Sequence, residues 1–401
     1  MEGDFIKINE WLLPLSWFYG IGVGFRNFLF DVGFLKSRAY KVPVIAVGNI
    51  TVGGTGKTPH VEHLVRLLHN LLGVAVLSRG YKRKSRGFVV AADDTPMRMI
   101  GDEPFQMKQK FPDVTVAVDH KRTRGIEQLT SGSQGNSIDV VLLDDAFQHR
   151  YVKPGINILL VDYHRLIIYD RLLPAGRLRE PLKGKNRADI VIITKCPKDL
   201  KPMHYRVITK AMDLYPYQQL YFTSLDYEPL CPVFAETKPM PAANDTTPSQ
   251  PFPATLADTN VLLLTGIASP RQLIEDLKPY AGKITPLTFP DHHSFSRKDI
   301  RLLNKTFSEL PQPRCIITTE KDAARLLTVN DLSDDVRQHL YALPVRISFM
   351  LEQEESFNQN IIGYVHKNSR NSILAKVKDD HKTKDSNRTG NRPRTISFRN
   401  H

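Results

Sequence analysis

The segment that most directly suggests chemistry is VPVIAVGNITVGGTGKTPHVEHLVRLL, residues 42–68. It places a lysine and a threonine after a glycine-rich loop, whose backbone N–H groups can surround phosphate oxygens. The lysine would reach the β- and γ-phosphates, and the threonine hydroxyl would bind Mg²⁺. The usual spelling, G-x-x-x-x-G-K-[ST], fails at one position, because Thr51 stands five places before Gly56. The residues predicted to bind the nucleotide are Gly53, Gly54, Thr55, Gly56, Lys57 and Thr58.

The segments on either side of this loop have the pattern that the motif requires. Residues 42–47 are apolar and largely β-branched, which is typical of a buried parallel strand. After the loop, apolar residues recur at helical spacing from Val61 to Leu72, and Gly73 ends the predicted helix. Pro59 falls in the first turn, where its missing N–H is tolerated. The order strand, glycine loop, helix therefore predicts a phosphate site at a helix N-terminus.

A pair of carboxylates is the second constellation. In IDVVLLDDAFQHR, an apolar strand ends at Asp144 and Asp145. Two adjacent acids at the end of a buried strand are unfavourable without a cation, so we predict that they hold Mg²⁺ together with Thr58. One carboxylate would bind the metal through water, and the other would bind it directly or orient the acceptor.

For the other polar motifs, residue type alone does not distinguish a functional role from a structural one. Asp102 in IGDEPFQM would stabilise a helix N-terminus, and His292 in FPDHHSFS would be an exposed loop residue. The basic loops SRGYKRKSRG and LLPAGRLREPL either bind phosphates or form a charged surface. TTEKDAARL is explained by helix capping.

These motifs lie between strands and helices that alternate along the chain, which predicts an α/β fold with a mostly parallel, P-loop NTPase-like sheet flanked by helices. Seven prolines between residues 229 and 253 indicate a linker, and a second, smaller α/β block follows it. The predicted divisions are an N-terminal apolar helix at 1–38, a nucleotide-binding core at 39–226, a linker at 227–259, a smaller α/β domain at 260–366 and a basic, disordered tail at 367–401.

The N-terminal segment, residues 11–35, is rich in aromatic residues and leucine. Its longest uncharged stretch is shorter than the roughly 20 residues that cross a bilayer, and it lacks the cleavage site of a signal peptide. Tryptophan and tyrosine beside cationic residues are typical of a helix that lies in the membrane interface. We therefore predict peripheral attachment at the cytoplasmic face of a membrane. A helix in the core of the protein is the alternative.

The composition restricts the compartment, the metal and the partners that we expect for this protein. Three separated cysteines in 401 residues argue for a reducing compartment and against zinc. The net charge is +13, and more than half of it lies in residues 367–401. This tail either only improves solubility or contacts anionic lipid or nucleic acid, but it lacks the interleaved aromatic residues of a nucleic-acid binder. Pro197 replaces the aspartate that a guanine-binding T-K-x-D loop needs, which favours ATP.

Seven motifs, in this order, resemble the tetraacyldisaccharide 4′-kinase family of lipid A biosynthesis: VGNITVGGTGKTP, SRGY, GDEP, DDAFQH, LLPAGRLREP, FPDHH and TEKDA. The resemblance extends to about residue 350. It implies transfer of the γ-phosphoryl group of ATP, with Mg²⁺, to the 4′-hydroxyl of an acylated disaccharide 1-phosphate. By match to GDEP, Asp102 would be the catalytic base, and by match to FPDHH, His292 would pair with it. Glu180 and His149 would lie near the nucleotide or Mg²⁺.

Three residues depart from the pattern that is common in the family. Ala146 stands where glycine is common, Lys82 where glycine follows SRGY, and Arg177 where proline is common. None of these removes a proposed catalytic group.

The alternative function is a membrane-bound P-loop ATPase or nucleotide sensor with no lipid acceptor, in which Asp102 and His292 would be dispensable. For the kinase we expect no nucleic acid and no obligate protein partner.

Overall fold

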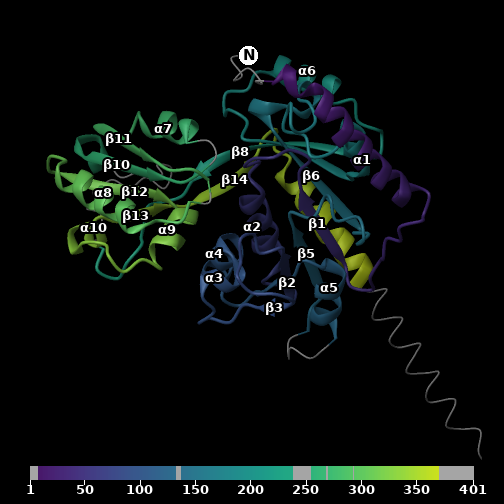
Figure 1. Cartoon of the computed structure of the whole chain (residues 1–401), viewed down its shortest axis with the longest axis horizontal. Coiled ribbons are helices and arrows are strands. Elements are labelled where there is room, and N and C mark those ends of the chain that lie inside the picture. Colours follow the sequence, from purple (N-terminus) through teal and green to yellow (C-terminus); the bar gives the residue numbers. More distant parts are fainter. Residues whose placement is uncertain (1–7, 132–136, 238–253, 268–269, 292, 370–401) are drawn as a thin grey trace, which may run out of the picture.

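Two β-sheets organise the chain, as Figure 1 shows for this computed structural model. The structure describes residues 8–131, 137–237, 254–267, 270–291 and 293–369. A large, mostly parallel sheet flanked by helices forms one lobe, and a smaller sheet with its own helices forms the other. The predicted α/β fold class is therefore confirmed. We call these lobes the first unit and the second unit.

The nine-stranded sheet of the first unit carries the phosphate-binding loop. Its strands, in spatial order, are β14 (Val345–Phe349), β8 (Gln219–Tyr227), β7 (Ile190–Thr194), β6 (Ile156–Asp162), β1 (Val44–Gly48), β5 (Val140–Asp144), β2 (Val74–Ser78), β4 (Thr115–Val118) and β3 (Val89–Val90). Only the two edge strands, β14 and β3, run antiparallel to their neighbours among these pairings. The carboxyl ends of the parallel strands therefore meet at one edge, where ligands of such sheets bind.

The second unit is built on a five-stranded sheet. Its strands, in spatial order, are β11 (Lys283–Thr288), β10 (Asn260–Thr265), β12 (Arg314–Thr319), β13 (Leu340–Leu343) and β9 (Cys231–Pro232). The labelled α-helices in the described part of the chain are α1 (Leu13–Asp31), α2 (Lys57–Leu68), α3 (Met97–Ile100), α4 (Asp102–Lys110), α5 (Arg122–Thr130), α6 (Pro202–Met212), α7 (Arg271–Leu277), α8 (Arg297–Ser308), α9 (Glu320–Leu326) and α10 (Asp334–Gln338). A last helix covers residues 354–369.

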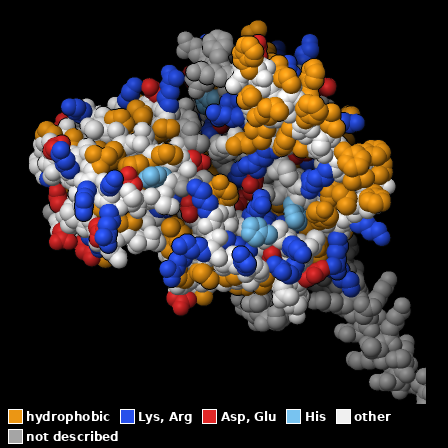
Figure 2. Space-filling model, in the orientation of Figure 1, with side chains coloured by type: hydrophobic (Ala, Val, Ile, Leu, Met, Phe, Trp, Pro, Cys, Tyr) orange, Lys and Arg blue, Asp and Glu red, His pale blue; other side chains and the backbone are white. Residues whose placement is uncertain are grey.

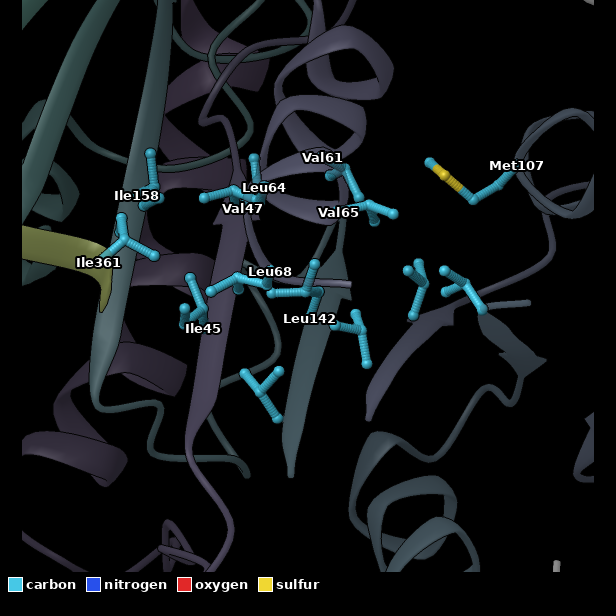
Figure 3. Close-up of a cluster of buried hydrophobic side chains, with 14 of the residues drawn as sticks. Ile45, Val47, Val61, Leu64, Val65, Leu68, Met107, Leu142, Ile158 and Ile361 are labelled. Carbon is cyan, nitrogen blue, oxygen red and sulfur yellow. The ribbon is translucent and has the colours of Figure 1, made fainter. Parts of the chain in front are cut away.

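Hydrophobic packing fixes the sheet on both faces. On one face, Val61, Leu64 and Leu68 of α2 pack on Ile45 of β1 and Leu142 of β5, as Figure 3 shows. The last helix adds Phe357, Ile361 and Val365 to the same cluster. On the opposite face, α5 and α6 cover the sheet through two further clusters. Because α2 is held along its length, its N-terminus has a fixed position against the end of β1.

One predicted strand belongs to a different sheet than expected. The sequence analysis placed residues 345–349 in the second α/β block, but β14 pairs with β8 in the nine-stranded sheet. The helix at 354–369 also packs on that sheet. An apolar strand can pair at any free edge, so the pattern predicts the strand and not its partner. The short strands β3, β9 and β13 were not predicted. The strand predicted at residues 42–47 forms as β1, and the strand predicted to end at Asp144 forms as β5.

The N-terminal helix forms as predicted and exposes much of its apolar surface. Trp17, Phe18 and Ile21 of α1 are about 70% exposed, at 73%, 74% and 69%. Figure 2 shows hydrophobic side chains gathered along the edge of the molecule where Figure 1 places α1. Among the described helices, none combines the length and the apolar character needed to cross a membrane. The predicted tail lies outside the described residues, except for its first three positions.

Candidate active site

The glycine loop wraps the N-terminus of α2, as the sequence predicted. Gly56 has a φ of +77°, a left-handed conformation that favours glycine, and Gly53 has a φ of +125°. These conformations let the loop turn back before α2 begins at Lys57. Buried Asn49 donates from Nδ2 to the hydroxyl of Thr55 at 2.9 Å, which holds the two ends of the loop together. This hydrogen bond therefore stabilises the turned-back shape of the loop.

Neighbouring strands also hold the loop from behind. The hydroxyl of Thr194, at the end of β7, donates to the carbonyl of Thr55 at 3.0 Å. The ammonium group of Lys195 contacts the carbonyl of Gly54 and forms an ion pair of 2.8 Å with Asp162. Thr194 and Lys195 are the residues that the sequence analysis compared with a guanine-binding loop. Here their side chains support the phosphate-binding loop.

The predicted metal-binding pair lies beside the loop lysine. Nζ of Lys57 is 3.5 Å from Oδ1 of Asp145, and Arg179 donates to the same carboxylate at 3.4 Å. The hydroxyl of Ser78, at the end of β2, donates to Oδ2 of Asp144 at 3.3 Å. Three parallel strands thus bring Lys57, Ser78 and the two aspartates to one edge of the sheet.

The electrostatics around Asp144 suit a cation. Asp144 is buried, and burial together with the nearby carboxylates of Glu103 and Asp145 raises its pKa to about 7. Its Oδ1 is buried and accepts no hydrogen bond within the described part of the chain. A divalent cation would satisfy that oxygen and stabilise the ionised form. No cluster of three or more His, Cys, Asp or Glu side chains is found among the described residues, so phosphate oxygens and water would complete the shell of a Mg²⁺ ion.

Asp102 begins α4, as the sequence predicted, and it is paired with an arginine of the second unit. Gly101 has a φ of +95°, and a Cβ there would lie 2.9 Å from the carbonyl oxygen of Tyr81, so glycine is required at this turn. The turn presents Asp102 to α9, where Nη2 of Arg325 lies 2.6 Å from its Oδ2. The neighbouring Glu103 is 3.7 Å from Nζ of Lys321, also on α9.

The proposed partner of Asp102, His292, lies outside the described residues. Its neighbour Asp291 forms an ion pair of 3.2 Å with Lys321. The next residue, His293, has its own partners in the second unit: its Nε2 pairs with Asp299 at 2.9 Å, and its ring stacks on Phe289. Lys321 therefore links the FPDHH and GDEP motifs, although the pairing of His292 with Asp102 stays a prediction.

Glu180 and His149 were predicted near the nucleotide or the metal. Glu180 is buried, and it accepts hydrogen bonds from Gln148 at 2.9 Å and Arg187 at 2.8 Å. Gln148 also donates to the backbone of Asn49 at 2.7 Å, so Glu180 supports the loop from its buried side. Burial and nearby arginines lower the pKa of His149 to about 4, which keeps its ring neutral. Direct ligand contact by either residue stays a prediction.

The sequence analysis did not single out three side chains that contact this site. They are Ser78 and Arg122, which bond to Asp144, and Arg325, which bonds to Asp102. Arg122 is buried, and its Nη2 donates to the backbone carbonyl of Asp144 at 3.0 Å. Only the i, i+3 spacing of Asp322 and Arg325 after TEK hinted at an anchored arginine, and that spacing is common on helices.

Comparison with known proteins supports one family throughout. The family model described as tetraacyldisaccharide-1-P 4′-kinase matches residues 8–366. The tetraacyldisaccharide 4′-kinase of Phocaeicola vulgatus is 58% identical over 373 residues, which cover 93% of this chain and 99% of that protein. The enzyme of the same name from Bacteroides thetaiotaomicron is 54% identical over 387 residues, covering 96% of this chain and 100% of the relative.

A solved structure agrees with the sequence relatives. The crystal structure of LpxK from Aquifex aeolicus in complex with ATP superposes with a TM-score of 0.66 at 30% sequence identity. The match covers 88% of this chain and 98% of that protein. Because the family model spans most of its length and its relatives match nearly end to end, this chain belongs to the tetraacyldisaccharide-1-P 4′-kinase family.

Proposed function

We propose that this protein transfers the γ-phosphoryl group of ATP to the 4′-hydroxyl of tetraacyldisaccharide 1-phosphate, which gives lipid IVA. The observation that carries this proposal is the shaped loop ending in Lys57 beside Asp144 and Asp145, in a chain of this kinase family. The loop N–H groups and Lys57 would bind the phosphates of ATP and stabilise negative charge in the transition state.

The metal site is part of the same proposal. Thr58, Asp144 and Asp145 would hold Mg²⁺ between the protein and the phosphates. The bound ion would neutralise charge on the β- and γ-phosphates. The chain's own part is to present the two carboxylates on a fixed strand end, with Lys57 and Arg179 balancing Asp145.

Asp102 is the proposed base, with His292 as its partner. The acceptor's 4′-oxygen attacks the γ-phosphorus as its proton passes to the carboxylate of Asp102. A bond forms between that oxygen and phosphorus, the bond to the β–γ bridging oxygen breaks, and ADP leaves with the electron pair. Glu180 and His149 would act as supports of the nucleotide and metal site.

We also propose where the enzyme works and how its chain is divided. The exposed aromatic face of α1 suits peripheral attachment at the cytoplasmic side of the inner membrane, since a four-chain lipid does not readily leave the bilayer. The domain division predicted from sequence is retained as a proposal, with β14 and the last helix assigned to the nucleotide-binding domain.

A mass measurement tests the reaction. Tetraacyldisaccharide 1-phosphate in detergent micelles is incubated with ATP, Mg²⁺ and either the parent protein or Asp102→Ala. We expect the lipid to gain one phosphate with the parent and at least about 100-fold more slowly with the variant. ATP consumption without any change in lipid mass would instead support the ATPase or sensor alternative.

A further inference from the structure

Arg325 joins the second unit directly to the proposed base. Its Nε and Nη2 donate to Oδ2 of Asp102 at 2.9 and 2.6 Å. Asp102 is the first residue of α4 in the first unit, whereas Arg325 lies in the last turn of α9 in the second unit. The arginine is 4% exposed, so water screens this pair weakly.

The second unit holds the guanidinium firmly. Nη1 of Arg325 donates to Oδ1 of Asp322 at 2.7 Å and to the carbonyl of Gly266 at 3.3 Å. Asp322 is fully buried and is fixed in turn by the N–H of Gly266 at 2.8 Å and the hydroxyl of Thr319 at 2.8 Å. The second unit therefore anchors Arg325 through the turn after β10 and the N-terminus of α9, in addition to its bonds with Asp102.

The geometry of the two hydrogen bonds determines how Arg325 orients the carboxylate of Asp102. Both end on the same oxygen, so they fix the carboxylate's rotation and its distance from α9. Paired donors from a planar guanidinium give more directional control than a lysine does. A neighbouring cation also favours the ionised carboxylate, which is the form that accepts a proton.

We propose that Arg325 is a positioning residue for phosphoryl transfer, holding Asp102 in place and ionised while the two units are docked. The inference rests on the proposed function, in which Asp102 takes the proton of the 4′-hydroxyl. Arg325 keeps its own protons throughout and touches neither ATP nor the acceptor. It makes the activity of a first-unit base depend on the presence of the second unit.

Among the described residues, other charged groups lie at this contact between α4 and α9. Glu103 follows Asp102 on α4, Lys321 and Asp322 lie on α9, and Asp291 follows β11. Lys321 pairs with Glu103 and Asp291, and Asp322 pairs with Arg325. The ion pair of Arg325 with Asp102 joins the two units directly.

The test compares two substitutions of Arg325 with a matched control on the same helix. Glu320→Gln is the control, because Glu320 of α9 pairs with Lys110 of α4 at 2.7 Å, away from Asp102. For each protein, kcat, both KM values and the pH dependence of kcat/KM are measured between pH 5 and 9. The assay is phosphate gain of the lipid, and circular dichroism checks folding.

We expect Arg325→Gln to lower kcat about 100-fold through loss of alignment, with KM values changed less than about threefold. The acid limb of its kcat/KM profile should move up by about 1–3 pH units, because the ionised base has lost its cation. Arg325→Lys should keep the acid limb near that of the parent, because the positive charge is retained. Its kcat should fall about tenfold, because lysine lacks the planar guanidinium that aligns the carboxylate. Glu320→Gln should resemble the parent.

Each contrary result has a distinct meaning. Parent kcat and an unshifted pH profile in Arg325→Gln would overturn this inference while the proposed function stands. Equal losses in Arg325→Gln and Glu320→Gln, without a shift, would reduce Arg325 to a packing role and also overturn it. If Arg325→Gln does not fold, the test rests on Arg325→Lys. An unchanged kcat in Arg325→Lys would then overturn this inference. A parent that never adds phosphate would overturn the proposed function and this inference together.

Discussion

Asp144 is the residue whose surroundings fit a cation best, since it is buried, carries an unsatisfied oxygen and sits beside a second carboxylate. We predict that Asp144→Asn raises the Mg²⁺ concentration for half-maximal activity by about 10–100-fold. Asparagine has the same shape and can still accept from Ser78, so the fold should persist. The measurement is a Mg²⁺ titration of the initial rate.

A neighbouring acid provides the control for that titration. Asp162 also ends a parallel strand at this edge, but it is paired with Lys195 and His164. Asp162→Asn should leave the Mg²⁺ midpoint within about threefold of the parent's. Equal shifts in both variants would mean that any charge lost from this edge has the same effect, and Asp144 would lose its proposed role.

Glu62 allows a test of pH dependence. Burial is the main cause that raises its pKa to about 7, even though Lys110 lies 2.7 Å away. Because the folded pKa exceeds the usual value of 4.5, the folded state binds the extra proton between those values, and stability falls as pH rises toward 7. Glu62→Gln should therefore gain stability over the parent as pH rises from 5 to 8, by about 1–3 kcal/mol.

Thermal melts at pH 5, 6, 7 and 8 would measure the difference. Glu228→Gln is the control, because Glu228 pairs with Arg66 of the same helix α2 but is half-exposed. Because this ion pair is partly exposed, Glu228→Gln should change the melting temperature only slightly. A Glu62→Gln difference that shrinks with rising pH would contradict the burial argument.

At the scale of elements, α1 carries the exposed apolar face and is tied to the active site. The hydroxyl of Tyr19 donates to the carbonyl of Arg179 at 2.7 Å, and Arg179 contacts Asp145. Docking of α1 on a membrane would therefore place the loop beside the nucleotide site close to the lipid surface. In the proposed attachment, the helix would set the distance between the catalytic groups and the bilayer.

Replacing Trp17, Phe18 and Ile21 together by serine should weaken binding to anionic vesicles at least about tenfold, since each exposed side chain contributes about 1–2 kcal/mol when it enters lipid. Co-sedimentation with vesicles would measure it. The matched control replaces two exposed leucines of the second unit, Leu302 and Leu327, by serine. Equal binding by the triple variant and the parent would exclude α1 as the attachment site.

The last helix is a second element whose role can be isolated by truncation. Phe357, Ile361 and Val365 are almost fully buried in the first unit's core. A chain ending at residue 369 should melt like the parent and stay active, because the family match ends at 366. A chain ending at 353 loses three core side chains, each worth about 2–5 kcal/mol, and should be insoluble or melt far lower. Similar melting of the two truncations would contradict this packing.

For the whole molecule, the sequence predicted what local pattern controls. The strand, loop and helix around Lys57 formed as expected, because apolar periodicity and glycine positions are local signals. So did the placement of Asp102 at a helix start and Asp144 at a strand end. The sequence did not predict which sheet β14 joins or that Arg325 pairs with Asp102. Each depends on contacts between residues more than a hundred positions apart.

The return of the chain through β14 also bears on how the protein is made. The ribosome releases β8 long before its edge partner exists, since roughly 120 residues separate them and synthesis at about 5–20 residues per second takes about 6–24 s. During that interval the nascent first unit lacks both β14 and the last helix, so an open strand edge and an apolar sheet face are exposed to solvent. The interval before residues 345–369 emerge is when a chaperone would be most needed.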